Sequence, residues 1–522
     1  MAVRMFSAID VGSHEIEMKI FELSRKNGIR QIEDIRHRLD LGTDTYHTGK
    51  ISSRHLAGMR KILQEFSQIM KNYQVEAYRA CGTSAFREMQ NASIVVSRLE
   101  QVTGIRIEIL GNAEQRFLDY KSIAARSGDF NALIENGTAI VDIGGGSVQI
   151  SLFDNGKLVT TQNIRLGVLR IQDQLDRIGA APARFEGLVR ELFDSRLRIF
   201  ANLYLQGREI KNLIVVDDYI SEIMAKQNVR DFLSRQAGLE ETPRMLPSEQ
   251  FFFLYDQIKA FGAAETARIF EIPDENVPLL KISSIIVRSI LDMTKADTLW
   301  IPGVVLCDGI VYDYAEKNRI LSVDHDFQKD IIASAHEISR RYNGSEERSR
   351  TLEKIALKIF DATEKLHGLS ARERLLLQIA AILHDCGKFI SMNNLAECAY
   401  QIIMSTEIIG ISKKEREIIA NVVRFNHADF VYYEEQTEID RETYLVIAKL
   451  TAILRAANGL DRSHRRKFSD FKIRMKDGQL FITVDARIDI TLEKGLFDRR
   501  ADFFEEIFAV RPVIRQKKTG GK

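Results

Sequence analysis

The fold of this chain is decided by the stretch Ala139-Ile140-Val141-Asp142-Ile143-Gly144-Gly145-Gly146-Ser147-Val148-Gln149-Ile150-Ser151-Leu152, in which three glycines separate two apolar runs. The pattern predicts a strand, a tight turn and a second strand. Glycines let the backbone approach a ligand closely. Successive N–H groups in such a turn, with the Ser147 hydroxyl beside them, form a concavity suited to phosphate oxygens, and Asp142 could hold a magnesium ion there. A plain hairpin turn fits the same residues.

A second segment near the N-terminus repeats this pattern. Phe6-Ser7-Ala8-Ile9-Asp10-Val11-Gly12-Ser13 is an apolar run that ends at an aspartate and a Gly-Ser turn, and alternating apolar residues follow it. Two copies of strand, aspartate, turn and strand predict two related subdomains that face each other. A phosphate held between the two turns would lie near both Asp10 and Asp142.

Composition limits the class of protein. The chain has 522 residues, long enough for several domains, and its 74 Lys and Arg residues almost balance its 73 Asp and Glu residues. This balance calls for neither a nucleic-acid nor a membrane partner. The four cysteines have no zinc-ribbon spacing, and no window approaches 18 uninterrupted apolar residues. We therefore expect a reduced, soluble, cytoplasmic protein.

Four motifs occur in a characteristic order. They are Asp10-Val11-Gly12-Ser13, Gly82-Thr83-Ser84-Ala85-Phe86-Arg87-Glu88, Gly111-Asn112-Ala113-Glu114-Gln115-Arg116 and Asp142-Ile143-Gly144-Gly145-Gly146-Ser147. In this order they resemble the exopolyphosphatase and guanosine pentaphosphate phosphohydrolase (Ppx/GppA) family. The resemblance includes Leu166-Gly167-Val168 and continues into the C-terminal half. It implies two actin-like (ribonuclease H-like) α/β subdomains, Mg²⁺ as cofactor, and release of terminal phosphate from inorganic polyphosphate or pppGpp, commonly by a homodimer.

The resemblance also implies a set of site residues. Glu114 is the implied general base that orients a water for attack on a terminal phosphoryl group. The implied phosphate-binding residues are Ser13, Ser84, Arg87, Gly144, Gly145, Gly146 and Ser147, and the implied Mg²⁺ ligands are Asp142 and Asp10. Two of these residues have plainer interpretations. Glu114 could serve only the start of the helix expected over 114–125, and Ser84 could be a helix cap with Arg87 solvated.

Several positions depart from the family pattern. The family usually has Asn, Glu and Arg where this chain has His14, Gln149 and Cys307. After the strand expected over 213–216, Asp217 and Asp218 replace a phosphate-facing Ser-Gly-Thr turn. Two carboxylates repel an anion. We interpret them as solvated loop acids, with recruitment of a metal as the alternative.

These departures keep a second function open. It is a catalytically weakened regulatory protein that binds polyphosphate or (p)ppGpp with the same fold. An actin-like sugar kinase is a third, weaker possibility, because acids replace the third turn. The sequence does not rank polyphosphate against pppGpp.

The chain divides by composition into four expected domains. They are actin-like subdomain I (1–125), actin-like subdomain II (126–321), an HD-like helical domain (322–465) and a small α+β appendage (466–522). In subdomain II we expect helices over 183–204 and 282–294, a strand over 297–301, and a closing helix at about 303–317 that packs back on subdomain I. In the appendage, alternation around Asp477-Gly478 predicts a hairpin, a helix over 499–508 follows, and the basic tail 515–522 is expected to be disordered at its end.

The HD-like assignment depends on one pair of residues. Helices are expected over 327–342, 346–367 and 371–383, and the last of them ends at His384-Asp385, a pair typical of metal phosphohydrolases. The accompanying ligands are missing, because the expected His falls near Arg348 or Ser349 and the expected Asp falls on Asn458. His427 and Asp461 are possible substitutes. We interpret the domain as non-catalytic, with the basic run 462–467 either lining the path of a long anion or simply solvated.

Overall fold

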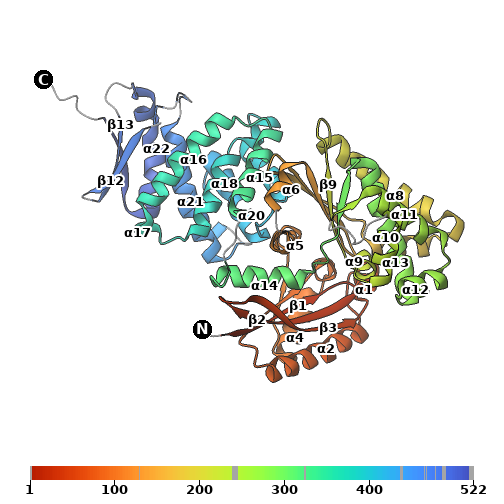
Figure 1. The fold of residues 1–522 in the computed structure, drawn as a ribbon. Coiled ribbons are helices and arrows are strands. Elements are labelled where there is room, and N and C mark those ends of the chain that lie inside the picture. The colour runs from red at the N-terminus through yellow and green to blue at the C-terminus, as the bar shows by residue number, and fades with distance from the viewer. Residues whose placement is uncertain are drawn as a thin grey trace. The chain divides into compact units, whose positions relative to one another are not determined.

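The computed structural model describes residues 3–127, 130–237, 245–321, 325–435, 439–461, 463, 465, 467–468, 470–476, 478–484 and 489–516. The chain divides into two compact units, residues 1–327 and 328–522 (Figure 1). Ser322, where the sequence predicted a boundary, lies outside the described residues. No helix in the described ranges is both long and apolar enough to cross a membrane.

The first unit begins with a mixed sheet of order β3-β2-β1-β4-β5. Its strands are β1 (Arg4–Val11), β2 (Glu15–Ser24), β3 (Gly28–Arg38), β4 (Ala77–Gly82) and β5 (Ile107–Ile109). Its helices are α1 (Leu41–Thr48), α2 (Ser53–Asn72), α3 (Ser84–Glu88), α4 (Ala92–Thr103) and α5 (Asn112–Arg126). One sheet face packs on α2 and α4, and the other packs on α5 and a later helix. Both faces of β1 are therefore buried, which explains its nearly continuous apolar sequence.

A second sheet repeats this topology, with order β10-β11-β9-β6-β7-β8. Its strands are β6 (Thr138–Ile143), β7 (Val148–Asp154), β8 (Lys157–Ile164), β9 (Asn212–Asp217), β10 (Leu246–Pro247) and β11 (Thr298–Trp300). In both sheets three antiparallel strands come first, a fourth then adds in parallel beside the first of them, and another adds in parallel beside the fourth. In the second sheet β10 pairs antiparallel with β11 at the edge. The predicted strand, turn and strand around the triple glycine is confirmed, and so is the predicted similarity to the N-terminal segment.

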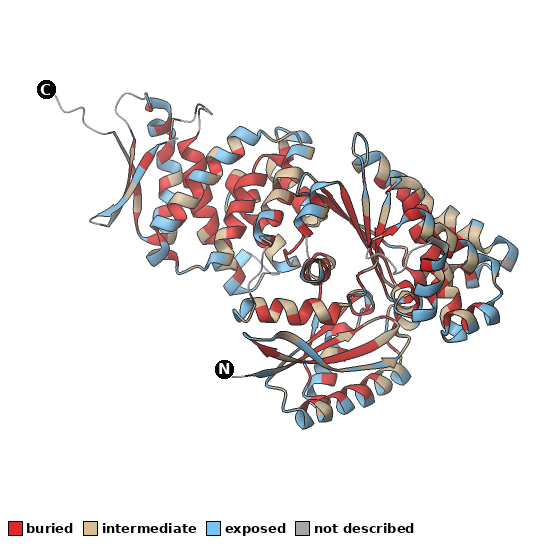
Figure 2. Ribbon diagram, viewed as in Figure 1, coloured by how far each residue is buried: buried red, intermediate tan, exposed pale blue. Residues whose placement is uncertain are grey.

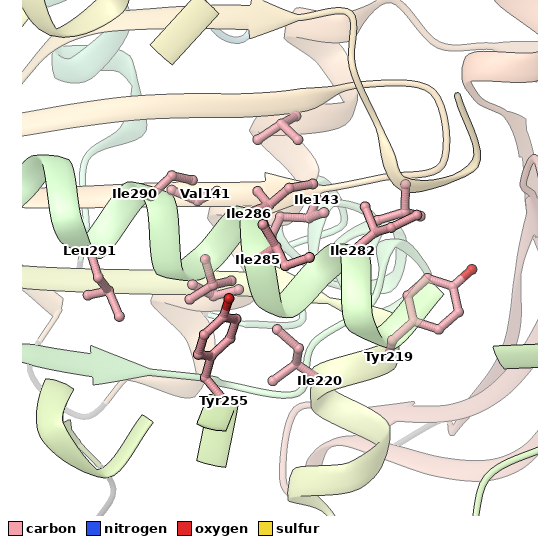
Figure 3. Close-up of a cluster of buried hydrophobic side chains, with 14 of the residues drawn as sticks. Val141, Ile143, Tyr219, Ile220, Tyr255, Ile282, Ile285, Ile286, Ile290 and Leu291 are labelled. Atoms are coloured by element: carbon pink, nitrogen blue, oxygen red, sulfur yellow. The ribbon is translucent and has the colours of Figure 1, made fainter. Parts of the chain in front are cut away.

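Helices cover both faces of the second sheet. They are α6 (Phe130–Glu135), α7 (Val168–Arg177), α8 (Phe185–Tyr204), α9 (Asp218–Met224), α10 (Gln227–Ala237), α11 (Ser248–Ala260), α12 (Ala263–Phe270) and α13 (Val277–Thr294). Figure 3 shows α13 packing Ile282, Ile286 and Ile290 against side chains of the sheet. The sequence analysis expected this helix from residue 282, five residues after its observed start at Val277, and Pro278 lies in its first turn. Proline is compatible with the first turn of a helix, where its missing N–H has no partner to lose.

Helix α14 (Leu306–Lys317) follows the second sheet in sequence but packs on β1 and α5 of the first. Gly309 makes this close approach possible, because an added Cβ would lie 2.6 Å from the carbonyl carbon of Leu118. Buried ion pairs flank the contact, with Lys19 Nζ 3.1 Å from Asp308 Oδ1 and Lys121 Nζ 2.8 Å from Asp313 Oδ1. Buried residues accordingly recur along α14, as Figure 2 shows, and α5 also carries many buried residues.

The second unit is mainly helical and ends in a small sheet. Its helices are α15 (Phe327–Arg341, which begins at the last residue of the first unit), α16 (Glu346–Ala362), α17 (Glu364–His367), α18 (Ala371–Leu383), α19 (Leu395–Ser405), α20 (Lys413–His427), α21 (Arg441–Leu460) and α22 (Thr491–Phe508). The strands β12 (Phe471–Lys476) and β13 (Gln479–Val484) form the predicted hairpin, although Asp477 lies outside the described residues. β14 (Arg511–Gln516) adds in parallel to β13.

Three predictions for this unit were wrong in detail. The single helix expected over 346–367 ends at Ala362, because Thr363 leaves helical geometry and its hydroxyl donates to the carbonyl of Ile359. Helix α22 begins at Thr491 rather than Arg499. Strand β14 was missed, because its basic residues and Pro512 conceal the alternation, and the predicted disorder at the end of the tail falls on residues outside the described ones.

Candidate active site

The glycine loop, residues 144–147, joins β6 to β7 with its carbonyls and N–H groups turned to different partners. The Gly144 N–H donates to the Ser147 carbonyl over 3.0 Å, which closes the turn. The carbonyls of Gly144 and Gly145 accept from Val168 and Leu169 at the start of α7, over 3.1 and 3.0 Å. Within the described residues, no hydrogen bond uses the N–H groups of the three residues 145–147. Three neighbouring backbone donors are therefore available to an anion.

Gly167 holds α7 against this loop. A Cβ added at Gly167 would collide with the Gly144 carbonyl oxygen and the Ser147 nitrogen. Its φ of −85° is open to any residue, so close approach alone requires glycine here. The motif Leu166-Gly167-Val168 thus belongs structurally to the glycine loop.

Three hydroxyls lie against the other side of the glycine loop. Ser13 Oγ is 2.6 Å from Ser84 Oγ and 2.9 Å from Tyr46 Oη. A Cβ added at Gly146 would collide with Tyr46 Oη and lie 3.2 Å from the Ser84 Cβ. The structure therefore brings together the predicted residues Ser13, Ser84 and Gly146. Ser84 is the first residue of α3 and not its cap.

Tyr46 was missed by the sequence reasoning. It lies on α1, whose sequence carries no phosphate motif.

Arg87 joins this group from α3. Its Nη1 donates to the Leu110 carbonyl and to Gln115 Oε1, each over 3.0 Å. The interpretation of Arg87 as a solvated residue is therefore wrong. Burial lowers the pKa of its guanidinium, while the charges of Asp142 and Asp10, among other groups, oppose that shift. A cation is thus held within electrostatic range of both candidate metal ligands.

Glu114 stands at the third position of α5. Its Oε2 accepts the Gly111 N–H over 2.9 Å, so the carboxylate completes the start of the helix, as the plainer interpretation predicted. This bond does not exclude a catalytic role. It fixes the orientation of the carboxylate, which is what a general base requires.

Asp10 and Asp142 end the equivalent strands β1 and β6. Burial raises the pKa of Asp10, with Glu17 adding to the shift. Burial also raises the pKa of Asp142 to about 7, with Asp218 adding and Arg116 opposing. Gln149 Nε2 donates to Asp142 Oδ2 over 3.0 Å. Gln149 Oε1 and Asp10 Oδ1 are buried, and no hydrogen-bond partner lies near either atom in the part of the chain that the structure describes.

Asp217 and Asp218, the acids that replace the third turn, differ in their exposure to solvent. Asp217 is buried and caps α9, because its Oδ1 accepts the Ile220 N–H and its Oδ2 accepts the Ser283 hydroxyl, each over 2.6 Å. Burial raises the pKa of Asp217 to about 7. The prediction of a solvated loop acid is therefore wrong for Asp217. Asp218, the first residue of α9, is exposed as predicted.

The other two departures from the family pattern, His14 and Cys307, contact residues of the surrounding fold. His14 Nδ1 is 2.5 Å from Asp40 Oδ1. Burial alone would raise the pKa of Asp40, but the hydrogen bond and charge of His14 lower it. Cys307 is fully buried with its Sγ 3.6 Å from the Ala8 carbonyl, and burial raises the pKa of its thiol. Cys307 therefore packs as a small apolar residue rather than acting as a nucleophile.

A basic pocket of about 540 Å³ lies beside the glycine loop. Its lining contains three arginines and no carboxylate, with amide and apolar side chains between them: Gln162, Asn163, Ile164, Arg165, Leu166, Arg170, Gln174, Arg196, Ile199, Phe200, Leu203 and Tyr204. Arg170 connects the pocket to the loop, because its Nε donates to the Gly146 carbonyl over 3.1 Å. Its Nη2 lies 2.6 Å from Glu88. The sequence showed no signal for this pocket beyond the position of Arg165 next to Leu166-Gly167-Val168.

In the second unit, an arginine occupies the centre at His384-Asp385. Arg348 Nη1 lies 2.5 Å from Asp385 Oδ2, and its Nη2 donates to Asn458 Oδ1 over 3.4 Å. Lys388 Nζ also lies 2.8 Å from Asp385 Oδ1. Among the described residues, no three His, Cys, Asp or Glu side chains are placed to hold a metal ion. The Arg348 guanidinium thus binds the Asp385 carboxylate, and the non-catalytic interpretation stays a prediction.

The histidines of this centre are bound to carbonyls. The His384 Nδ1–H donates to Ala381 over 2.8 Å, and the His427 Nε2–H donates to the His384 carbonyl over 2.8 Å. Burial lowers the pKa of His384 to about 3 and that of His427 to about 4. Both rings are therefore neutral near pH 7. Parts of the basic run 462–467 lie outside the described residues.

Because His427 is neutral in the fold, we expect the stability of the second unit to depend on pH. Its pKa is about 4 in the fold and about 6.5 in an unfolded chain, so the unfolded state binds more protons between these values. Stability of the second unit should therefore fall as pH drops from 6.5 towards 4. In His427→Gln, which keeps a donor for the carbonyl, the loss between pH 7 and 4.5 should shrink by about 2 kcal/mol. Native-state hydrogen exchange of α20 amides measures this, and an unchanged pH dependence would contradict it.

Comparison with known proteins matches both units of the chain to family models. The Ppx/GppA phosphatase family model matches residues 20–318, and domain III of the Ppx/GppA phosphatases matches residues 332–500. The guanosine-5'-triphosphate,3'-diphosphate pyrophosphatase of Photobacterium profundum is 19% identical over 92% of each chain. Its counterpart in Aeromonas hydrophila subsp. hydrophila is 20% identical over 87% of this chain and 86% of that one.

A solved structure supports the fold independently. An exopolyphosphatase from Cytophaga hutchinsonii superposes with a TM-score of 0.52 at 16% identity, covering 61% of this chain and 100% of that one. At this identity the likeness concerns the fold alone. The family models together span most of the chain, and the glycine loop, the Ser13 turn and Glu114 all lie within the described fold. This chain belongs to the Ppx/GppA phosphatase family.

Proposed function

We propose that this protein is a Mg²⁺-dependent phosphoanhydride hydrolase that releases terminal phosphate from inorganic polyphosphate, with pppGpp as the other candidate substrate. The basic pocket beside the glycine loop carries the proposal. Three arginines without a lining carboxylate suit a chain of phosphates better than a single phosphate group. The names of the relatives, a pyrophosphatase acting on a guanosine phosphate and an exopolyphosphatase, support this class of reaction.

The roles of the residues follow from their geometry. The terminal phosphate would be bound by the N–H groups of residues 145–147 and by the Ser13 and Ser84 hydroxyls, with Arg87 contributing positive charge. Glu114, oriented by the Gly111 N–H, would position the attacking water and accept its proton. Hydrolysis of a phosphoanhydride needs little else from the protein, because positioning and charge stabilisation supply most of the catalysis.

The residues present fit a magnesium ion. Asp142 and Asp10 would hold it, and two buried acceptor atoms beside them, Asp10 Oδ1 and Gln149 Oε1, have no donor in the described part of the chain. Carboxylate and amide oxygens are the ligands that Mg²⁺ prefers. When bound, the ion would neutralise charge on the transferring phosphoryl group.

A regulatory protein that binds phosphates without turnover is the alternative. It is favoured by Gln149, which supplies no charge beside Asp142, and by Asp217, which caps a helix in place of the third turn. Phosphate release from long-chain polyphosphate and from pppGpp, with and without Mg²⁺, separates the two functions. Tight binding with no release above the background of Glu114→Gln would select the regulatory protein.

Because of the basic pocket, we expect KM to depend on the length of the polyphosphate. Arg165→Glu combined with Arg196→Glu should raise KM for long-chain polyphosphate about a hundredfold or more, since it removes two charge-assisted contacts that contribute about 1.5–3 kcal/mol each. KM for tripolyphosphate should rise less, because a shorter chain of phosphates makes fewer contacts with the pocket. Arg198→Glu is the matched control, because this exposed arginine lies on the same helix as Arg196 and, among the described residues, bonds only to the Asp194 carbonyl. An equal effect in the control would contradict the prediction.

A further inference from the structure

Helix α5 carries a buried acid that the proposed mechanism does not use. Asp119 is 5% exposed and lies three residues after Arg116, so the two side chains share one face of the helix. Arg116 Nη1 donates to Thr161 Oγ1 on β8, and Thr161 Oγ1 lies 2.9 Å from Ser151 Oγ on β7. The face of α5 that carries Asp119 is therefore packed on the second sheet.

The same face of that sheet carries the candidate metal ligand. Ser151 and Gln149 are two residues apart on β7, so their side chains point to one side. Gln149 stands opposite Asp142 in the β6–β7 register and donates to its carboxylate over 3.0 Å. Asp142, Gln149 and Ser151 therefore face α5 together.

Two buried oxygens in this layer have no donor. Asp119 Oδ2 and Gln149 Oε1 have no hydrogen-bond partner among the residues that the structure describes, and both side chains are more than nine-tenths buried. Burial raises the pKa of Asp119, the charges of Asp142 and Asp10 add to the shift, and the charge of Arg116 opposes it. A buried carboxylate oxygen without a donor is costly unless a cation compensates it.

We propose that Asp119 is an additional carboxylate for the divalent cation that Asp142 and Asp10 would hold, supplying from α5 the charge that Gln149 does not supply from β7. This inference rests on the cation of the proposed function. No three acidic, His or Cys side chains in the described ranges stand close enough for direct coordination. Asp119 therefore acts through the water shell of the ion, and Mg²⁺ characteristically keeps several of its waters.

Mn²⁺ binding to the full chain tests this without turnover. Electron paramagnetic resonance of free Mn²⁺ gives the affinity in the absence of substrate. Asp119→Asn, which keeps the side-chain shape, should weaken Mn²⁺ binding about ten- to a hundredfold, the usual loss for a group that supports metal ligands. Gln149→Glu in the same chain should restore binding, because it returns the lost charge at the same ion. Asp256→Asn, at an exposed position on α11, is the matched control.

The outcomes separate this inference from the proposed function. An unchanged Mn²⁺ affinity in Asp119→Asn, an equal loss in the control, no restoration by Gln149→Glu, or no Mn²⁺ binding by the native chain would each overturn the inference. A chain that binds Mn²⁺ through Asp119 but hydrolyses neither polyphosphate nor pppGpp would overturn the proposed function and support this inference. Circular dichroism of each variant verifies that the fold is intact.

Discussion

Glu114→Gln should lower the turnover number for phosphate release by about a hundred- to ten-thousand-fold, the usual effect of removing a general base. The glutamine keeps an oxygen that can accept the Gly111 N–H, so the start of α5 should remain intact. Binding of polyphosphate should therefore survive, because the glycine loop, the hydroxyls and the basic pocket are untouched. The measurements are the turnover number and the equilibrium affinity for long-chain polyphosphate.

The control for this experiment is Glu100→Gln. Glu100 is exposed on α4 and has no part in the proposed site. Full activity in Glu100→Gln with strong loss in Glu114→Gln is expected. Unchanged turnover in Glu114→Gln would remove Glu114 from the catalytic role and leave it as a helix cap.

Gly167→Ala should disrupt the glycine loop itself. The new Cβ would collide with the Gly144 carbonyl and the Ser147 nitrogen and lie 2.5 Å from the Gly145 carbonyl carbon. All three are backbone atoms, so no side chain can rotate away, and the loop and α7 must separate. Overpacking of this kind costs about 1–3 kcal/mol. The displaced N–H groups should also lose their geometry, so phosphate affinity should fall together with stability.

Gly187→Ala provides a matched comparison. Gly187 lies in α8, and an added Cβ there would meet nothing within 4 Å. Alanine should stabilise this helix by about 0.5–1 kcal/mol, since glycine is a poor helix former. Urea denaturation and polyphosphate binding would be measured for both variants. If Gly167→Ala behaves like Gly187→Ala, the close packing of α7 on the loop is not what holds the site.

Much of the fold was predictable because its signals are local. Alternating or continuous apolar runs that end at Asp10 and Asp142, each followed by small residues, predicted both β-turn-β segments correctly. Helix α18 was predicted with its observed bounds, because its apolar residues, interrupted only by Gln378, continue up to His384. Boundaries were wrong at the start of α13, where Pro278 lies in the first turn, and at Thr363 between α16 and α17.

The site residues likewise divide into those that local motifs predicted and those that depend on distant contacts. Ser13, Ser84 and the glycines lie in motifs, and the structure brings them together. Asp217 was misjudged because an acid after a strand looks the same whether it faces water or caps a buried helix. Its two hydrogen bonds come from Ile220, three residues on, and from Ser283 on a distant helix. Only the bond from Ser283 depends on tertiary packing, but Asp217 could not be buried without that bond.

By itself, the sequence determined the duplicated α/β pattern, the glycine loop and the position of Glu114, because dihedral preference, hydrophobic period and helix-start chemistry act over a few residues. Only the tertiary structure decided which distant groups meet them. Tyr46 and Arg170 contact the Ser13 hydroxyl and the loop, Arg196 lines the pocket beside it, Asp119 lies on the face of α5 that packs on the second sheet, and Arg348 binds Asp385. These contacts join residues far apart in the chain. Their geometry follows from how helices pack on sheets, which no short stretch of sequence encodes.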